Sequence, residues 1–96
     1  MNLGKKIKSI RICERLNQVD FSQLIDLPIG TLQGYEQEKR HPTSEGLLKI
    51  TTHEQLKKYT LWLMTGDTAL ESGQVCPDFS ILLSCGLIED ETEKRA

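Results

Sequence analysis

Residues 16–36 read LNQVDFSQLIDLPIGTLQGYE, and the first half of this stretch has the features of a short amphipathic helix. Asn17 can accept a hydrogen bond from a backbone amide at the start of that helix, and Asp20 places negative charge beside the positive end of the helix dipole. Phe21, Leu24 and Ile25 follow at three- and four-residue spacing, which puts them on one face. The sequence therefore predicts a helix over about 18–25 whose apolar face is turned to a core.

A tight turn and a second helix follow. Asp26 suits the turn because a short polar side chain tolerates a left-handed backbone, and Pro28 has the fixed φ of a first helical position. Over residues 28–37, only Leu32 and Tyr35 are obvious core residues. The outward faces carry Ile29, Gly30, Thr31, Gln33 and Gly34. Two short helices joined in this way form a helix-turn-helix, whose second helix normally lies in the major groove of DNA.

The motif resembles the lambda-repressor-like helix-turn-helix family of the xenobiotic-response-element type. The matching residues are Leu16-Asn17-Gln18, Leu24-Ile25, Thr31-Leu32 and Tyr35-Glu36, with further matches at 3–11, 39–43, 47–50 and 61–66. Within this family, residues 58–62 (KYTLW) and 71–74 (ESGQ) resemble the short C immunity repressors of peduovirus-type temperate coliphages. The resemblance implies an all-α fold with a five-helix DNA-binding domain over residues 1–66.

The rest of the chain predicts three more helices and a distinct C-terminal segment. Apolar spacing indicates helices over about 3–15, from a cap at Thr43 through Ile50, and over about 54–65, with Leu48 in the core and Gly66 as a C-terminal stop. Residues 75–76 suit a brief strand, and residues 77–87 fit either a strand or a helix. We expect residues 67–88 to form a dimerisation segment and the acidic residues 89–96 to form a flexible tail.

The composition fits one small domain inside a cell. The 96 residues match the size of a single domain, and the chain has neither a signal peptide nor the run of about 18 apolar residues that a membrane span requires. The three cysteines lack Cys-x-x-Cys spacing and the two histidines lack ligand-like neighbours. We therefore expect reduced thiols, a cytoplasmic location, and no metal or other cofactor.

Charge is divided unevenly along the chain. The net charge is −2 at pH 7, which by itself argues against a nucleic-acid partner. Residues 1–58, however, carry ten Lys and Arg against seven Asp and Glu, whereas residues 59–96 carry two against seven. The cations thus accompany the helix-turn-helix. Because this local excess is small, it predicts moderate non-specific affinity and gives sequence-specific contacts more weight.

The family resemblance implies roles for residues around the recognition helix. Gln18 is expected to contact a backbone phosphate and to support the first reading residue of the second helix. Arg11 and Glu36 are expected to form a salt bridge between the first helix and the end of the recognition helix. We expect Lys39 and Arg40, which follow that helix, to lie along the sugar-phosphate backbone; a solvated charged loop is the alternative.

The outward residues of the recognition helix suggest how it reads DNA. Gln33 can bond adenine N6 and N7 together, Thr31 can contact a phosphate or a thymine methyl group, and Ile29 can offer apolar contact to such a methyl group. Gly30 and Gly34 would let the helix lie deep in the groove. The expected DNA-binding set is Gln18, Pro28, Ile29, Gly30, Thr31, Gln33, Gly34, Lys39 and Arg40.

Apolar residues near the C-terminus exceed what one small domain needs. The predicted helix over 54–65 is apolar around most of its circumference, which implies a second buried surface. The expected dimer interface comprises Tyr59, Trp62, Leu63, Val75, Phe79, Ile81 and Leu83. Ordinary core packing is the alternative explanation for the residues on the helix.

These features predict a sequence-specific transcriptional repressor. It would bind double-stranded operator DNA as a homodimer in the bacterial cell. The resemblance to phage C repressors further implies that it maintains lysogeny by silencing a lytic promoter, and its release would need a protein antirepressor or loss of the dimer. No pairing of nucleophile and base, phosphate loop or metal cluster indicates an enzyme. Three alternatives stay open: an antitoxin, a restriction-modification controller of the same fold, and a protein-interaction module that does not bind DNA.

Overall fold

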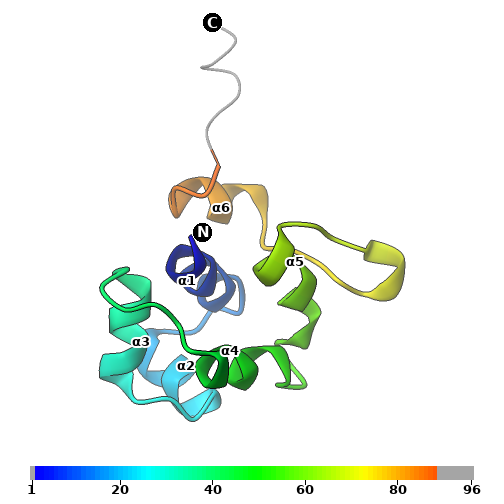
Figure 1. Ribbon diagram of the computed structural model, residues 1–96. Coiled ribbons are helices and arrows are strands. Elements are labelled where there is room, and N and C mark those ends of the chain that lie inside the picture. The colour runs from blue at the N-terminus through cyan, green and yellow to red at the C-terminus, as the bar shows by residue number, and fades with distance from the viewer. Residues whose placement is uncertain (1, 89–96) are drawn as a thin grey trace, which may run out of the picture.

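The helices are arranged around α1 (Leu3–Cys13) in the computed structural model, which describes residues 2–88. The other helices are α2 (Gln18–Leu24), α3 (Ile29–Glu36), α4 (Ser44–Thr51), α5 (Thr60–Thr65) and α6 (Phe79–Ser84), with the 3₁₀ turns η1 (Lys57–Tyr59) and η2 (Leu70–Ser72). Helices α3, α5 and α6 all pack against α1, and α6 covers the end of the molecule away from α2 and α4 (Figure 1). Since residues 2–88 contain no strand, the predicted all-α fold is confirmed.

Local sequence signals set the ends of several helices as predicted. The Asn17 side chain accepts a hydrogen bond of 2.7 Å from the Asp20 amide at the start of α2. Thr43 likewise accepts one of 3.0 Å from the Gly46 amide at the start of α4. Asp26 has a φ of 53° in the turn before α3. These short-range contacts satisfy backbone groups that a helix end otherwise leaves unpaired.

The core lies between α1 and the surrounding helices. Its fully buried side chains include Ile7, Ile10, Phe21, Leu32, Ile50, Leu56 and Leu63. Each such side chain stabilises the fold by about 1.5–3 kcal/mol relative to an exposed one. Gly4 of α1 touches the backbone of α3, since a Cβ atom there would overlap the Tyr35 carbonyl oxygen. The first helix therefore holds α3 at very short range.

The predicted helix over 54–65 is wrong in its first half. Residues 54–56 form turns instead, and the α-helix begins only at Thr60. The side chain of Gln74, from the loop after α5, accepts a hydrogen bond of 3.0 Å from the Leu61 amide and donates one of 3.1 Å to the Lys57 carbonyl. A long-range contact thus replaces bonds that a continuous helix would make. Leu48, predicted to lie in the core, is 55% exposed.

The suggested strand at residues 75–76 is also wrong. Val75 donates its amide to the Lys58 carbonyl at 2.8 Å, and the only pairing of strand type in residues 2–88 is an isolated bridge between Ala69 and Gln74. Of the two alternatives for 77–87, the helical one is confirmed by α6, which rests on α1. The five predicted helices are thus joined by a sixth. The predicted flexible tail, 89–96, lies outside the described residues.

Candidate nucleic-acid interface

A buried ion pair fixes α3, the predicted recognition helix, to α1. Arg11 Nε lies 2.8 Å from Glu36 Oε2 and Arg11 Nη2 lies 3.0 Å from Glu36 Oε1, so the guanidinium holds the carboxylate with two parallel bonds. The side chains of Arg11 and Glu36 are 13% and 3% exposed. A third donor, Arg11 Nη1, bonds the Leu16 carbonyl at 2.9 Å. A bidentate pair of this kind fixes orientation as well as distance.

Two glutamines extend this pair to the outer surface. Gln18 Nε2 donates to Glu36 Oε1 at 3.2 Å, and Gln33 Nε2 donates to Gln18 Oε1 at 3.3 Å. A continuous chain of hydrogen bonds therefore runs from Arg11 in α1 through Glu36 and Gln18 to Gln33. It restricts the exposed Gln33 side chain before any ligand arrives.

The outward face of α3 offers few side chains of its own. Ile29 is 37% exposed, and nothing lies within 4 Å of the position a Cβ atom would take on Gly30. Pro28, predicted to be the first helical residue, is instead the exposed N-cap, and α3 begins one position later at Ile29. Thr31 lies half-buried at one edge of this face. The open surface around Gly30 can approach another molecule closely.

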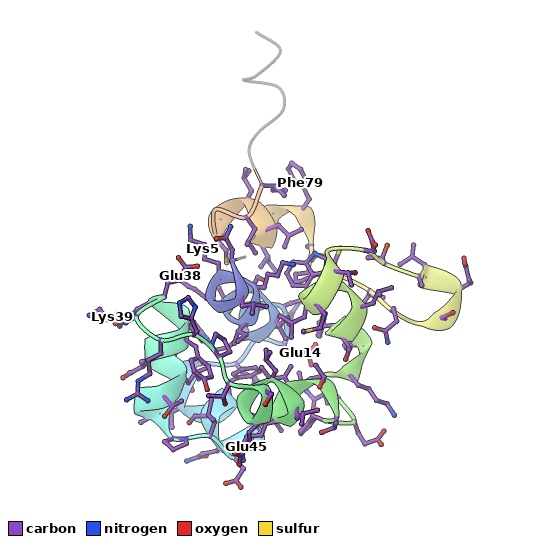
Figure 2. The ribbon with its side chains drawn as sticks, viewed as in Figure 1. Lys5, Glu14, Glu38, Lys39, Glu45 and Phe79 are labelled. Atoms are coloured by element: carbon purple, nitrogen blue, oxygen red, sulfur yellow. The ribbon has the colours of Figure 1, made fainter. Side chains whose placement is uncertain are left out.

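The two cations after α3 differ in position. Lys39 projects from the loop into solvent, away from the helices (Figure 2). The Arg40 side chain instead lies against Gly34, where an added Cβ atom would come within 2.9 Å of Arg40 Cδ. Arg40 Nη1 is 3.5 Å from Thr31 Oγ1. The space at Gly34 is therefore filled by Arg40 and is not open in the way that the space at Gly30 is.

Comparison with known proteins identifies the chain. No protein-family model matches it. The chain is 36% identical over 75 residues to "Repressor protein C" of Escherichia phage P2, an alignment that covers 78% of this chain and 76% of that protein. The chain belongs to the family of short phage C repressors. The helical fold and this kinship assign it a repressor role in transcription, of the peduovirus type that residues 58–62 and 71–74 suggested.

The expected dimer interface of this C repressor divides into two groups. Tyr59, Trp62 and Leu63 are core residues of the single chain, with exposures of 2%, 7% and 0%. The inference that they present a second apolar surface is wrong, because all three belong to the core of the single chain, in which α5 packs against α1. The α6 residues Phe79 and Leu83 remain 61% and 37% exposed. Val75 and Ile81 are half-buried, and Figure 2 shows Phe79 on the outer side of α6.

One supporting residue in this repressor was missed from the sequence. Lys49, at the end of α4, donates a hydrogen bond of 2.9 Å to the Asp26 carbonyl and lies 3.8 Å from the Asp26 carboxylate. It thereby ties α4 to the turn between α2 and α3. Lys49 is separated from Asp26 by 23 residues, and nothing in the local sequence signals the contact.

Glu14 forms the second polar cluster, between α1 and η1. Tyr59 Oη donates to Glu14 Oε2 at 2.6 Å, Gln55 Nε2 donates to Oε1 at 2.9 Å, and Lys58 Nζ lies 3.2 Å from Oε2. Burial alone would raise the pKa of Glu14, but the bonds from Tyr59, Gln55 and Lys58 outweigh it and hold that pKa below the ordinary 4.5. Burial, the Cys13 thiol and Glu14 together raise the pKa of the Tyr59 hydroxyl.

Other kinds of site find no support in the part of the chain that the structure describes. Among residues 2–88, no group of three or more His, Cys, Asp or Glu side chains could hold a metal ion. No helix in this range is long and apolar enough to cross a membrane. Cys13, Cys76 and Cys85 are free thiols.

Proposed function

We propose that this C repressor binds operator DNA sequence-specifically as a homodimer, with α3 in the major groove, and silences a lytic promoter in the cytoplasm of its bacterial host. The observation that carries the proposal is the chain of hydrogen bonds from Arg11 to Gln33. A protein-interaction module with the same fold has no need to fix an exposed glutamine in this way.

The geometry leaves Gln33 equipped to read adenine. Its amide uses one N–H on Gln18, and within residues 2–88 its oxygen and its second N–H make no hydrogen bond. An amide oxygen can accept from adenine N6 while the amide N–H donates to N7, which distinguishes adenine from the other bases. Gln18 also keeps a second N–H, because the first is directed at Glu36. That N–H suits a backbone phosphate, which would set the register of the protein on the duplex.

The experiment that tests the proposal compares Gln33→Ala with a matched control. Gln23→Ala removes an exposed glutamine from α2 whose side chain makes no hydrogen bond within residues 2–88. The operator is first located by footprinting the DNA upstream of the repressor's own gene. We expect Gln33→Ala to weaken binding to this operator by about 1–3 kcal/mol and to leave the affinity for random duplex unchanged. Gln23→Ala should bind both as the wild type does. Equal losses of Gln33→Ala on operator and random DNA would show that α3 is not the reader.

The dimer part of the proposal rests on α6. Phe79 and Leu83 are large apolar side chains one turn apart on its exposed side, and a second copy of the chain would cover them. Binding as one unit to two half-sites raises the operator affinity far above that of a single domain, because the second contact becomes intramolecular.

A further inference from the structure

The end of α3 brings a loop residue back over the helix. Glu38 has a φ of 59°, which reverses the chain directly after the helix. The amides of Lys39 and Arg40 then both donate to the Gly34 carbonyl, at 2.9 and 3.1 Å. The backbone of Arg40 is thus fixed beside the last turn of the recognition helix.

The side chain of Arg40 takes the place that a side chain at position 34 would have. A Cβ atom on Gly34 would lie 2.9 Å from Arg40 Cδ, 3.1 Å from Cγ and 3.5 Å from Cβ. The guanidinium continues toward the preceding turn of α3, where Nη1 lies 3.5 Å from Thr31 Oγ1. Side chains on a helix lean toward its N-terminus in the same way. Arg40 therefore presents its charge where a long residue at position 34 would present it.

Position 34 lies on the face of α3 that faces away from the core. The buried residues of the helix are Leu32, Tyr35 and Glu36. With about 100° between successive residues, Gly30 and Gly34 lie close to the opposite side of the helix. Because nothing lies within 4 Å of the position a Cβ atom would take on Gly30, the helix surface one turn before position 34 is open to an approaching base pair.

We propose that Arg40 reads a base edge in the major groove, beside Gln33, and is not a phosphate contact. The inference rests on the proposed DNA binding and deepens it. Guanine presents two acceptors there, O6 and N7, and a guanidinium can bond both at once. Within residues 2–88, no carboxylate pairs with Arg40, so its donors are not committed to an acid. Lys39, which projects into solvent (Figure 2), is left to contact the phosphates.

The test selects DNA from a random duplex pool with the full-length wild type and three variants. Arg40→Ala should enrich the wild-type motif with the preference for guanine lost at one position of each half-site. Gly34→Ala should lose the same preference, because the new methyl group displaces Arg40. Lys39→Ala is the matched control and should keep the preference at every position. Far-UV circular dichroism checks that each variant is folded. If Gly34→Ala does not fold, Arg40→Ala and the Arg40→Lys variant described next decide the role of Arg40.

Affinities measured on the selected motif complete the test. Arg40→Lys keeps the charge but loses the bidentate geometry, so its affinity for the motif should fall roughly 5- to 150-fold at unchanged affinity for random duplex. Lys39→Ala should instead weaken both equally and lower the salt slope by about one unit.

Two negative results are distinguishable. An Arg40→Ala chain that enriches the wild-type motif unchanged, or an Arg40→Lys chain that binds as the wild type does, overturns the role of Arg40 alone. A wild-type chain that enriches no motif overturns the proposed DNA-binding function and, with it, this role.

Discussion

Replacing Arg11 by methionine should destabilise the domain severely. The Glu36 carboxylate, 3% exposed, would then keep one hydrogen-bond partner among residues 2–88, the Gln18 amide at 3.2 Å. Removing one member of a buried ion pair costs about 3–5 kcal/mol, because the remaining charge stays desolvated without its counter-ion. Since small domains have a total stability of about 5–15 kcal/mol, Arg11→Met should lose a large fraction of it.

A double variant distinguishes the cost of leaving one buried charge unpaired from the loss of the ion pair itself. Arg11→Met/Glu36→Leu removes both charges and should recover most of the lost stability, as apolar replacements of buried ion pairs commonly do. The double variant should remain about 1–2 kcal/mol less stable than the wild type, because the Leu16 carbonyl and the Gln18 amide lose their hydrogen-bond partners. Operator binding should not recover, since Gln18 is no longer held against Gln33.

Urea unfolding at pH 7 measures these differences. Trp62, the single tryptophan of the chain and 7% exposed, supplies the fluorescence signal, and far-UV circular dichroism supplies an independent one. A loss below about 1 kcal/mol for Arg11→Met would refute the buried-charge argument. A double variant as unstable as the single one would do the same. A stable double variant that binds operator normally would show that the ion pair does not position the reading residues.

Two more predictions concern pH and assembly. Because the folded-state pKa of Glu14 is lowered, its contribution to stability is complete above the unfolded-state pKa and is lost as pH falls from about 4.5 through the folded-state pKa. The wild type should lose stability across this range, and Glu14→Gln should lose less. Urea midpoints of the two proteins that run parallel between pH 7 and pH 3 would contradict this. Phe79→Ser/Leu83→Ser should sediment as a folded monomer with weaker operator binding, while the control Leu70→Ser, at a residue 71% exposed, stays dimeric. A dimer of the α6 variant at micromolar concentration would place the interface elsewhere.

The parts of the fold that the sequence predicted depend on neighbours in the chain. Asn17, Asp26 and Thr43 act within three or four residues of themselves, so their side-chain chemistry is sufficient to predict α2, the turn and the start of α4. The Arg11–Glu36 contact was expected from the family resemblance, which carries three-dimensional information that a single sequence lacks.

The incorrect or missing predictions depend on distant contacts. The apolar pattern of residues 54–65 suits a helix throughout. The Gln74 side chain, from a later loop, nevertheless bonds the Leu61 amide and the Lys57 carbonyl, and the α-helix begins only at Thr60. Tyr59 and Trp62 were predicted to lie in a dimer interface, but packing against α1 buries them in the single chain. Of the candidate site, the outward residues of α3 were found, whereas the packing of Arg40 on Gly34 was not. That contact needs the chain reversal at Glu38, which no apolar periodicity reveals.

The buried and exposed sides of α3 can change independently, and this affects how the sequences of such repressors can diverge. Leu32 and Tyr35 are buried in the core, whereas Ile29 and Gly30 lie outside it. If α3 reads DNA as proposed, substitutions at Ile29 and Gly30 would change which bases it contacts at little cost in folding. On that proposal, related phages whose repressors differ at these two positions would recognise different operators, and each could reside in the same bacterium without silencing the other.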